Sequence, residues 1–294
     1  MKLKGITAFA ASLAALTLLG SAAWAQEMTF DPNDPAVIKG HEIMKGIDSL
    51  PVHQKLLGQA ELLIYDKQDK LLFTKRFRYA QYFEDYNKPE VRLRRSINYF
   101  FAPADDKGNG SMVFENEDSD DDEQYLYLRQ IRKARRIIGS SKKDDFFGSD
   151  FSLGDVTRRR YQDYNFRWLR EDAIEFRGKR LKMQKIESQF KDPQNREDWG
   201  EGKSVLWVHP SSGLVFKAER YNTQMQLHKV LTLTAFGKHK NPDGKNVYSV
   251  GGLRMETINR GTRSQFVVKS AKYEGDSGIS PSIYTTDSFT KKWW

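Results

Sequence analysis

Histidine, cysteine and closely spaced carboxylates are the side chains that most often bind metals, and this sequence does not arrange them for that task. Its five histidines show neither the H-x-x-x-H nor the H-E-x-x-H spacing, and it has no cysteine. The acidic run Asp118–Glu123 has the composition of a calcium loop. However, Glu123 occupies the position that needs glycine, and Arg129 occupies the position of the bidentate glutamate. We therefore predict no metal and no cofactor.

Serine chemistry has equally little support. The sequence contains no G-x-S-x-G turn, and Gly148-Ser149-Asp150 is followed by Phe151 rather than by a glycine that would expose the serine. Short polar side chains in turns usually bond the local backbone, so we expect Ser149 and Asp150 to bond their own loop. The prediction is that the protein is not an enzyme. A hydrolase acting on a lipid-like substrate stays open as an alternative.

The arginines carry more information, because they form groups in or beside expected strands. Arg132, Arg135 and Arg136 are the densest of these groups, and arginine binds phosphate and carboxylate in a bidentate manner. We predict that these three contact lipid head groups or an acidic partner at one rim of the fold. Basic strands interleaved with aromatic residues also suit single-stranded nucleic acid, but the first residues of the chain argue against that partner.

Those first residues have the pattern of a secretory signal peptide. Lys2 and Lys4 precede an apolar run from Ile6 to Leu19, and Ala23-Trp24-Ala25 is a small-x-small cleavage site. We predict cleavage near Ala25/Gln26, a signal peptide over 1–25 and one domain over 26–294. Because the first mature residue would not be cysteine, no lipid anchor is expected. Export without cysteine indicates a soluble periplasmic protein. The net charge of +9 for the full chain falls to +7 when Lys2 and Lys4 leave with the signal peptide, and this positive charge favours transient contact with a membrane surface rather than with nucleic acid.

The stretch Gln124–Val156 contains the most unusual pattern. Tyr125 to Leu128 alternate, which would place the tyrosines on one sheet face and the apolar pair Leu126 and Leu128 on the other. The loop that follows contains Phe146, Phe147, Gly148, Ser149, Asp150 and Phe151. Three phenylalanines in a turn-like segment need an apolar environment. They would either plug the rim of a sheet or, as we predict, line the mouth of a cavity together with Leu126 and Leu128.

The elements that must position this loop are mostly strands. A helix is expected over Ala36–Leu50, ended by Pro51, and the apolar period then changes from helical spacing to two. Strands are expected at 58–65, 71–84, 91–101, 112–115, 125–128, 157–161, 165–171, 180–190, 204–209, 214–221, 226–235, 247–250, 252–259 and 263–273, and loops at 192–202 and 275–294. The economical architecture is mainly β (α+β), with one strongly curved antiparallel sheet. This sheet would form an incomplete β-barrel covered by an N-terminal helix and by loop or helical lid segments.

One family matches this order of motifs. The strand Tyr125–Leu128, the arginines Arg132, Arg135 and Arg136, and the segment Phe147-Gly148-Ser149-Asp150-Phe151 with Asp155 resemble the LolA-like outer-membrane lipoprotein-sorting proteins. These proteins are periplasmic and are often encoded beside transporters of the resistance-nodulation-division (RND) type. The resemblance extends over roughly Ala36 to Trp294 as judged from the order of the motifs, with one departure: Arg129 stands where the family usually has proline.

The resemblance implies a fold and a function. The fold would be an incomplete barrel with an apolar interior, and the function would be a periplasmic carrier. It would shelter the acyl chains of a lipoprotein or lipid and shuttle them between an inner-membrane RND-type transporter and the outer membrane. The alternative is a non-catalytic accessory subunit of such a transporter, with a filled core and no cargo.

Overall fold

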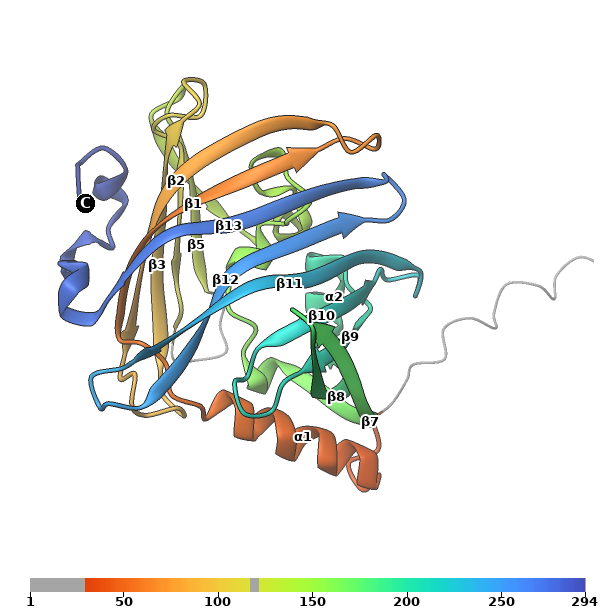
Figure 1. The fold of residues 1–294 in the computed structure, drawn as a ribbon. Helices are drawn as coiled ribbons and strands as arrows, with labels where there is room; N and C mark the ends of the chain where they lie inside the picture. Colours follow the sequence, from red (N-terminus) through yellow and green to blue (C-terminus); the bar gives the residue numbers. More distant parts are fainter. Residues whose placement is uncertain (1–29, 117–121, 294) are drawn as a thin grey trace, which may run out of the picture.

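The computed structural model of the protein describes residues 30–116 and 122–293. A single antiparallel sheet dominates it and orders thirteen strands as β6-β5-β4-β3-β2-β1-β13-β12-β11-β10-β9-β8-β7. Figure 1 shows the sheet curving strongly around an interior into which the segment between β6 and β7 folds. The two ends of the series, β6 and β7, do not pair with each other. The predicted incomplete barrel is therefore confirmed.

The strands are long at the centre of the sheet and short near one edge. Their bounds are β1 Lys55–Tyr65, β2 Leu71–Glu84, β3 Leu93–Ala102, β4 Gly110–Phe114, β5 Glu123–Leu128, β6 Lys133–Ile137, β7 Tyr164–Phe176, β8 Lys179–Phe190, β9 Lys203–Val208, β10 Val215–Tyr221, β11 Leu227–Lys240, β12 Asn246–Thr257 and β13 Thr262–Tyr273. Because neighbouring strands are antiparallel, the connections after β1, β3, β5, β8, β10 and β12 lie at the same end of the strands. We call this end the rim.

The N-terminal helix α1, Pro35–Asp48, covers the opposite end of the interior near β7 (Figure 1). Asp34 caps it by accepting a hydrogen bond from the backbone N–H of Ala36, and Pro35 occupies its first turn. Gly40 allows close packing, since a Cβ there would lie 2.7 Å from the backbone nitrogen of Trp168 on β7. His41 adds a hydrogen bond to the hydroxyl of Tyr161 at 3.0 Å.

The segment between β6 and β7 closes the open side of the sheet with four short 3-10 turns rather than strands. These turns are η1 Gly139–Lys143, η2 Phe146–Gly148, η3 Gly154–Val156 and η4 Tyr161–Asp163. A short helix, α2 Pro193–Trp199, packs against η1. The helix and lid segments predicted from the sequence to cover the barrel therefore correspond to α1 and this irregular segment.

The C-terminal segment covers the outer face of the sheet. After β13 come the 3-10 turns η5 Glu274–Ser277, η6 Pro281–Ile283 and η7 Thr286–Phe289. Phe289 stacks on Tyr127 of β5 with ring centroids 5.1 Å apart, and Tyr284 stacks on Tyr82. In Figure 1 the segment lies outside β2 and β3, on the side of the sheet away from the interior. The expectation of a loop-like, aromatic tail is correct.

Some element predictions are wrong. Residues 157–161 were expected to form a strand, but they form an irregular segment and the start of η4, because Arg158 to Arg160 bond to distant partners instead of to a neighbouring strand. The expected loop 192–202 contains α2, and the two strands expected at 247–250 and 252–259 form the single strand β12. The basic run after Leu128 includes the strand β6. The predicted signal peptide lies outside the described residues, as does most of the acidic run.

Candidate functional site

The concave face of the sheet forms an apolar wall. Ala60 of β1 pairs with Phe77 of β2, and Phe77 pairs with Phe100 of β3. On the other side, Leu62 pairs with Phe266 of β13. All of these side chains belong to one buried cluster or pack against it, together with Ile64, Leu231, Leu253 and Met255. The period of two thus directs one apolar face of six neighbouring strands, from β3 through β2, β1, β13 and β12 to β11, into the same interior.

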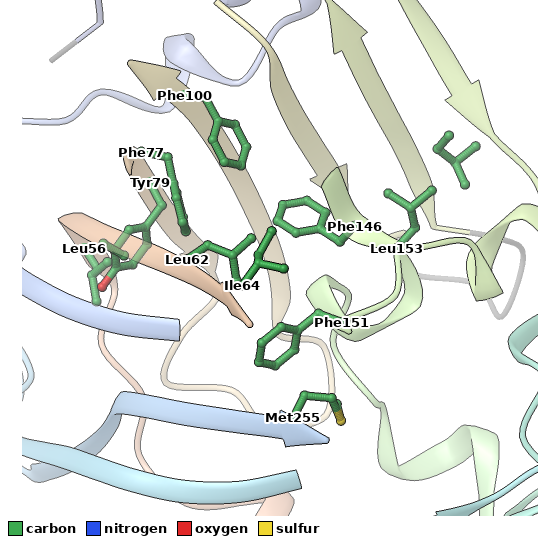
Figure 2. Close-up of a cluster of buried hydrophobic side chains, with 12 residues drawn as sticks. Leu56, Leu62, Ile64, Phe77, Tyr79, Phe100, Phe146, Phe151, Leu153 and Met255 are labelled. Carbon is green, nitrogen blue, oxygen red and sulfur yellow. The ribbon is translucent and has the colours of Figure 1, made fainter. Parts of the chain in front are cut away.

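The phenylalanine loop packs on this wall. Phe146 and Phe151 are buried in the same cluster, and Figure 2 shows both rings pointing toward Leu62, Ile64 and Phe77. Phe147 is partly buried, and its ring centroid lies 4.4 Å from that of Phe100. The backbone of Phe147 is left-handed, at φ 49°, and Gly148 follows at φ 75° with open space where a Cβ would be. The loop is therefore an apolar plug with an exposed tip.

Two largely apolar cavities remain in the interior, and one of them is lined by the plug. The inner cavity has a volume of about 290 Å³ and lies between the sheet and the plug; its lining includes Leu62, Phe77, Phe146, Phe151, Leu253 and Phe266. The helix cavity has a volume of about 250 Å³ and lies between α1 and β7–β11; its lining includes Met44, Ile47, Phe166, Leu206, Ala218 and Leu231. Ligand pockets in proteins are commonly ~300 Å³ or more, so each cavity is near the lower limit.

Buried polar contacts anchor the plug to the β12–β13 hairpin. The Asp150 carboxylate accepts hydrogen bonds from the hydroxyls of Thr257 at 2.6 Å, Thr262 at 2.5 Å and Ser264 at 2.7 Å. Its backbone N–H also donates to Ser264 at 2.9 Å. Ser149 bonds the carbonyl of Phe146 within the loop, as predicted. Asp150 does not bond its own loop, because the hairpin surrounds its carboxylate with three hydroxyl donors.

A second anchor is a buried group of alternating charges. Asp155 pairs with Arg220 of β10, and Arg159 forms two hydrogen bonds of 2.8 Å with Glu201. Burial of the Asp155 carboxylate opposes its ionisation, but the cations of Arg220, Lys229 and Arg159 outweigh this and hold its pKa well below its ordinary value. The same balance, with Arg159 and Arg220 as the cations, lowers the pKa of Glu201. Both carboxylates are therefore charged at neutral pH and attach the irregular segment to the sheet.

The structure brings together some of the predicted site residues. Leu126 packs against the interior cluster while Tyr127 packs under the C-terminal segment, which confirms the alternation predicted for this strand. Leu128 is half-buried and lines neither cavity. Arg132 lies in the turn after β5, at the rim. Arg135 and Arg136 are exposed on the edge strand β6, outside the interior.

Several interior residues were missed by sequence reasoning. One wall of the inner cavity is polar and consists of Gln81, Arg94, Ser96 and Asn98. Arg94 pairs with the buried Glu115 at 3.2 Å. The alternation of Arg94, Ser96, Asn98 and Phe100 along β3 was the available signal, but polar residues at this period usually indicate a solvated face.

The described residues contain no group of histidine, cysteine and carboxylate side chains that could hold a metal ion. Among the same residues, no helix has both the length and the apolar character needed to cross a membrane.

Comparisons with known proteins agree on the fold. A structure from Vibrio parahaemolyticus, named an outer membrane lipoprotein-sorting protein domain, superposes with a TM-score of 0.73 at 19% identity, covering 87% of this chain and 100% of that one. A DUF1329 family protein from Desulfovibrio piger also gives 0.73 at 22% identity, with 86% and 99% coverage. A LolA superfamily protein from Nitrosomonas europaea gives 0.59 at 17% identity, with 85% and 98% coverage.

At the level of sequence, no functionally curated protein matches the chain. A family model described as an uncharacterized protein matches residues 92–291, which include the plug and both of its anchors. The chain therefore belongs to this family of uncharacterized proteins, and its fold is LolA-like.

Proposed function

We propose that the protein is a periplasmic carrier that shelters the acyl chains of a lipid or lipoprotein inside its curved sheet. The observation that carries the proposal is the apolar inner cavity beneath the plug. An apolar concave surface that side chains only partly fill favours a ligand of matching chemistry. The shared fold with a protein named for lipoprotein sorting supports the same reading.

The plug would act as the lid of this carrier. Moving the ring of Phe147 at the tip away from Phe100 would cost at most about 1.5–3 kcal/mol, the value for a fully buried ring. An entering acyl chain contributes about 0.8 kcal/mol for each methylene that it buries, so roughly four methylenes offset the opening of the tip. Because each cavity alone is small, we propose that a bound chain displaces the tip of the plug and occupies the inner cavity beyond its resting volume.

Cargo bound in the cell provides the first test. Native mass spectrometry with lipid extraction, on protein purified from a periplasm without detergent, should detect co-purifying acyl species. Phe147→Asp should abolish them, because a carboxylate at the cavity mouth would be desolvated by any bound chain. Val91→Asp is the matched control, since Val91 is exposed and lines neither cavity. A ligand-free wild type that also rejects added lipids and acylated peptides would rule out the carrier and favour the accessory-subunit function.

We further propose that the rim makes transient contact with an anionic membrane surface when cargo is exchanged. Leu71, Leu72 and Phe73 at the start of β2 are 46%, 47% and 56% exposed, and they lie at the rim. Arg132 lies at the same end, and Arg135 and Arg136 extend from it along the edge strand. An inner-membrane transporter of the RND type is the proposed source of cargo, and the outer membrane is its proposed destination.

Vesicle sedimentation tests this contact. Each basic residue near an anionic surface contributes about 1 kcal/mol, so changing Arg132, Arg135 and Arg136 to Gln should weaken binding to phosphatidylglycerol vesicles at least tenfold. The control changes three exposed lysines at the opposite end of the strands, Lys240, Lys245 and Lys272, to Gln. Equal losses in the two triple variants would mean that net charge alone drives binding, and the rim contact would then be wrong.

A further inference from the structure

The apolar interior changes to a cationic surface at the rim end of β10 and β11. Arg220 of β10 and Lys229 of β11 are directly opposite each other in the register. Two residues deeper on the same face, Ala218 pairs with Leu231, and both line the helix cavity. Like charges that face each other across two strands repel, so this arrangement needs nearby anions.

Buried carboxylates form ion pairs with Arg220 and with its neighbour Arg159, but not with Lys229. Asp155 pairs with Arg220, and Glu201 pairs with Arg159. Lys229 is only 7% exposed, yet within residues 30–116 and 122–293 it forms no ion pair with a carboxylate. Its ammonium donates one hydrogen bond, to the backbone carbonyl of Asp150 at 2.7 Å, and two of its N–H groups have no acceptor in the same part of the chain. Burial lowers the pKa of Lys229, as expected for a cation that lacks a full counter-charge.

Lys229 faces a polar pocket of about 270 Å³, which we call the rim pocket. Its lining includes Lys143, Asp155, Glu201, Asn222, Lys229 and Asn259. Lys143 is exposed and also lacks an ion pair among the described residues. The rim pocket shares Asp155 with the inner cavity, and it shares Arg159 and Arg220 with the helix cavity.

We infer that the rim pocket binds a phosphate-bearing head group whose acyl chain enters the adjoining apolar cavities. The inference rests on the proposed carrier function and narrows its cargo to anionic amphiphiles. Lys229 supplies the two free N–H groups, Lys143 supplies a second cation at the entrance, and Asn222 and Asn259 supply neutral donors. Charge-assisted hydrogen bonds of this kind are about twice as strong as neutral ones. Arg220 and Arg159 already pair with the carboxylates of Asp155 and Glu201, so these carboxylates repel a bound phosphate less than unpaired carboxylates would.

The experiment compares three single-chain probes with the same palmitoyl chain: lysophosphatidic acid, lysophosphatidylcholine and monopalmitin. Inorganic phosphate is the fourth probe. Dissociation constants are measured by titration calorimetry on the chain from Gln26 onward. Lysophosphatidic acid should bind about tenfold more tightly than monopalmitin, and Lys229→Met should remove that preference while leaving monopalmitin binding unchanged. Lys182→Met, which removes an exposed lysine of β8 outside every cavity described above, is the matched control.

Two further variants separate binding from folding. Lys229→Arg keeps the positive charge and should retain most of the preference, whereas a purely structural role of Lys229 would make Lys229→Arg and Lys229→Met differ in stability but not in selectivity. Lys143→Met changes an exposed side chain and should reduce the preference by a smaller factor without changing thermal stability. A preference that persists in both Lys143→Met and Lys229→Met would overturn the inference.

The remaining outcomes distinguish this inference from the carrier function. If all three amphiphiles bind equally, the protein is a carrier but the head-group site is wrong. If no amphiphile binds, the carrier function fails. Binding of inorganic phosphate alone, lost in Lys229→Met, would then assign the rim pocket to a free anion and contradict the lipid head group.

Discussion

At the scale of single residues, the most informative side chains are the anchors of the plug rather than its phenylalanines. Asp150 binds three hydroxyls of one hairpin, and Asp155 pairs with an arginine of another strand. Phe151, which lies between Asp150 and Asp155 in the chain, is buried. Gly148, which precedes Asp150, is exposed and has open space where a Cβ would be. The segment therefore combines a fixed base with a tip at Phe147 and Gly148. Opening of the lid should be confined to that tip.

Replacing Asp150 tests whether the base of the plug is anchored through this residue. Asp150→Ala leaves three hydroxyls without their acceptor, and a buried donor left unsatisfied costs about 1–3 kcal/mol. We expect the free energy of unfolding to fall by about 2 kcal/mol or more in urea denaturation. Asp144→Ala, which removes an exposed neighbouring carboxylate, should change it by less than about 0.5 kcal/mol. Similar effects of the two variants would show that the loop is not anchored through Asp150.

The sequence predicted the hydrogen-bond partners of these residues only where the partners are close along the chain. Ser149 bonds the carbonyl of Phe146, as turn residues usually do. The partners of Asp150 are more than a hundred positions away, at Thr257, Thr262 and Ser264, and no local pattern connects them. The unpaired state of Lys229 has the same origin, since it depends on where distant carboxylates fold.

At the scale of elements, periodicity predicted long strands well and short or irregular elements poorly. The bounds of β2, Leu71–Glu84, are those expected from its alternation. The helix α2 was missed because it has only seven residues and little apolar pattern; it is defined by its caps, with Asp192 at the start and a left-handed Gly200 at the end. The arginines at 158–160 look like part of a strand in the sequence, but ion pairs hold them in an irregular segment.

The attachment of that segment to the sheet can be measured. Breaking a buried ion pair by removing one partner costs about 3–5 kcal/mol, so Arg159→Met should lower the free energy of unfolding by that amount. The double variant Arg159→Met/Glu201→Gln should recover much of the loss, because neither half of the broken pair then remains as an uncompensated charge. Lys88→Met, which breaks an exposed pair with Asp85, should cost less than about 1 kcal/mol.

The effect of pH on this ion pair has a defined sign. The pKa of Glu201 is lowered in the folded state, because the neighbouring arginines outweigh its burial. The Arg159–Glu201 pair therefore contributes fully to the free energy of unfolding above the ordinary carboxyl range, near pH 4–5. This contribution is lost as the pH falls below that range. Equal losses in the single and double variants at pH 7 would contradict the attachment of the irregular segment through the Arg159–Glu201 pair.

At the scale of the whole molecule, the open sheet encloses an interior that its side chains do not fill completely, which leaves the inner cavity and the helix cavity. The sequence indicated this from the number of strands relative to helix, and the thirteen-stranded sheet confirms the architecture. It did not indicate that the interior has a polar wall at β3 or a cationic end at β10 and β11. Inward-facing polar residues have the same period as outward-facing ones, so sequence alone does not assign the face. An amphiphile, rather than a purely apolar ligand, fits such an interior.

Site-specific photo-crosslinking in cells tests the central claim, that acyl chains occupy the interior. Benzoylphenylalanine replaces Phe266, which lines the inner cavity, or Tyr99, which alternates with the cavity-lining Asn98 and so lies on the outer face. After irradiation, mass spectrometry of the purified protein should find acyl adducts at position 266 and none at position 99. Adducts at both positions, or adducts at 99 alone, would mean that lipid contacts the surface and would contradict the account.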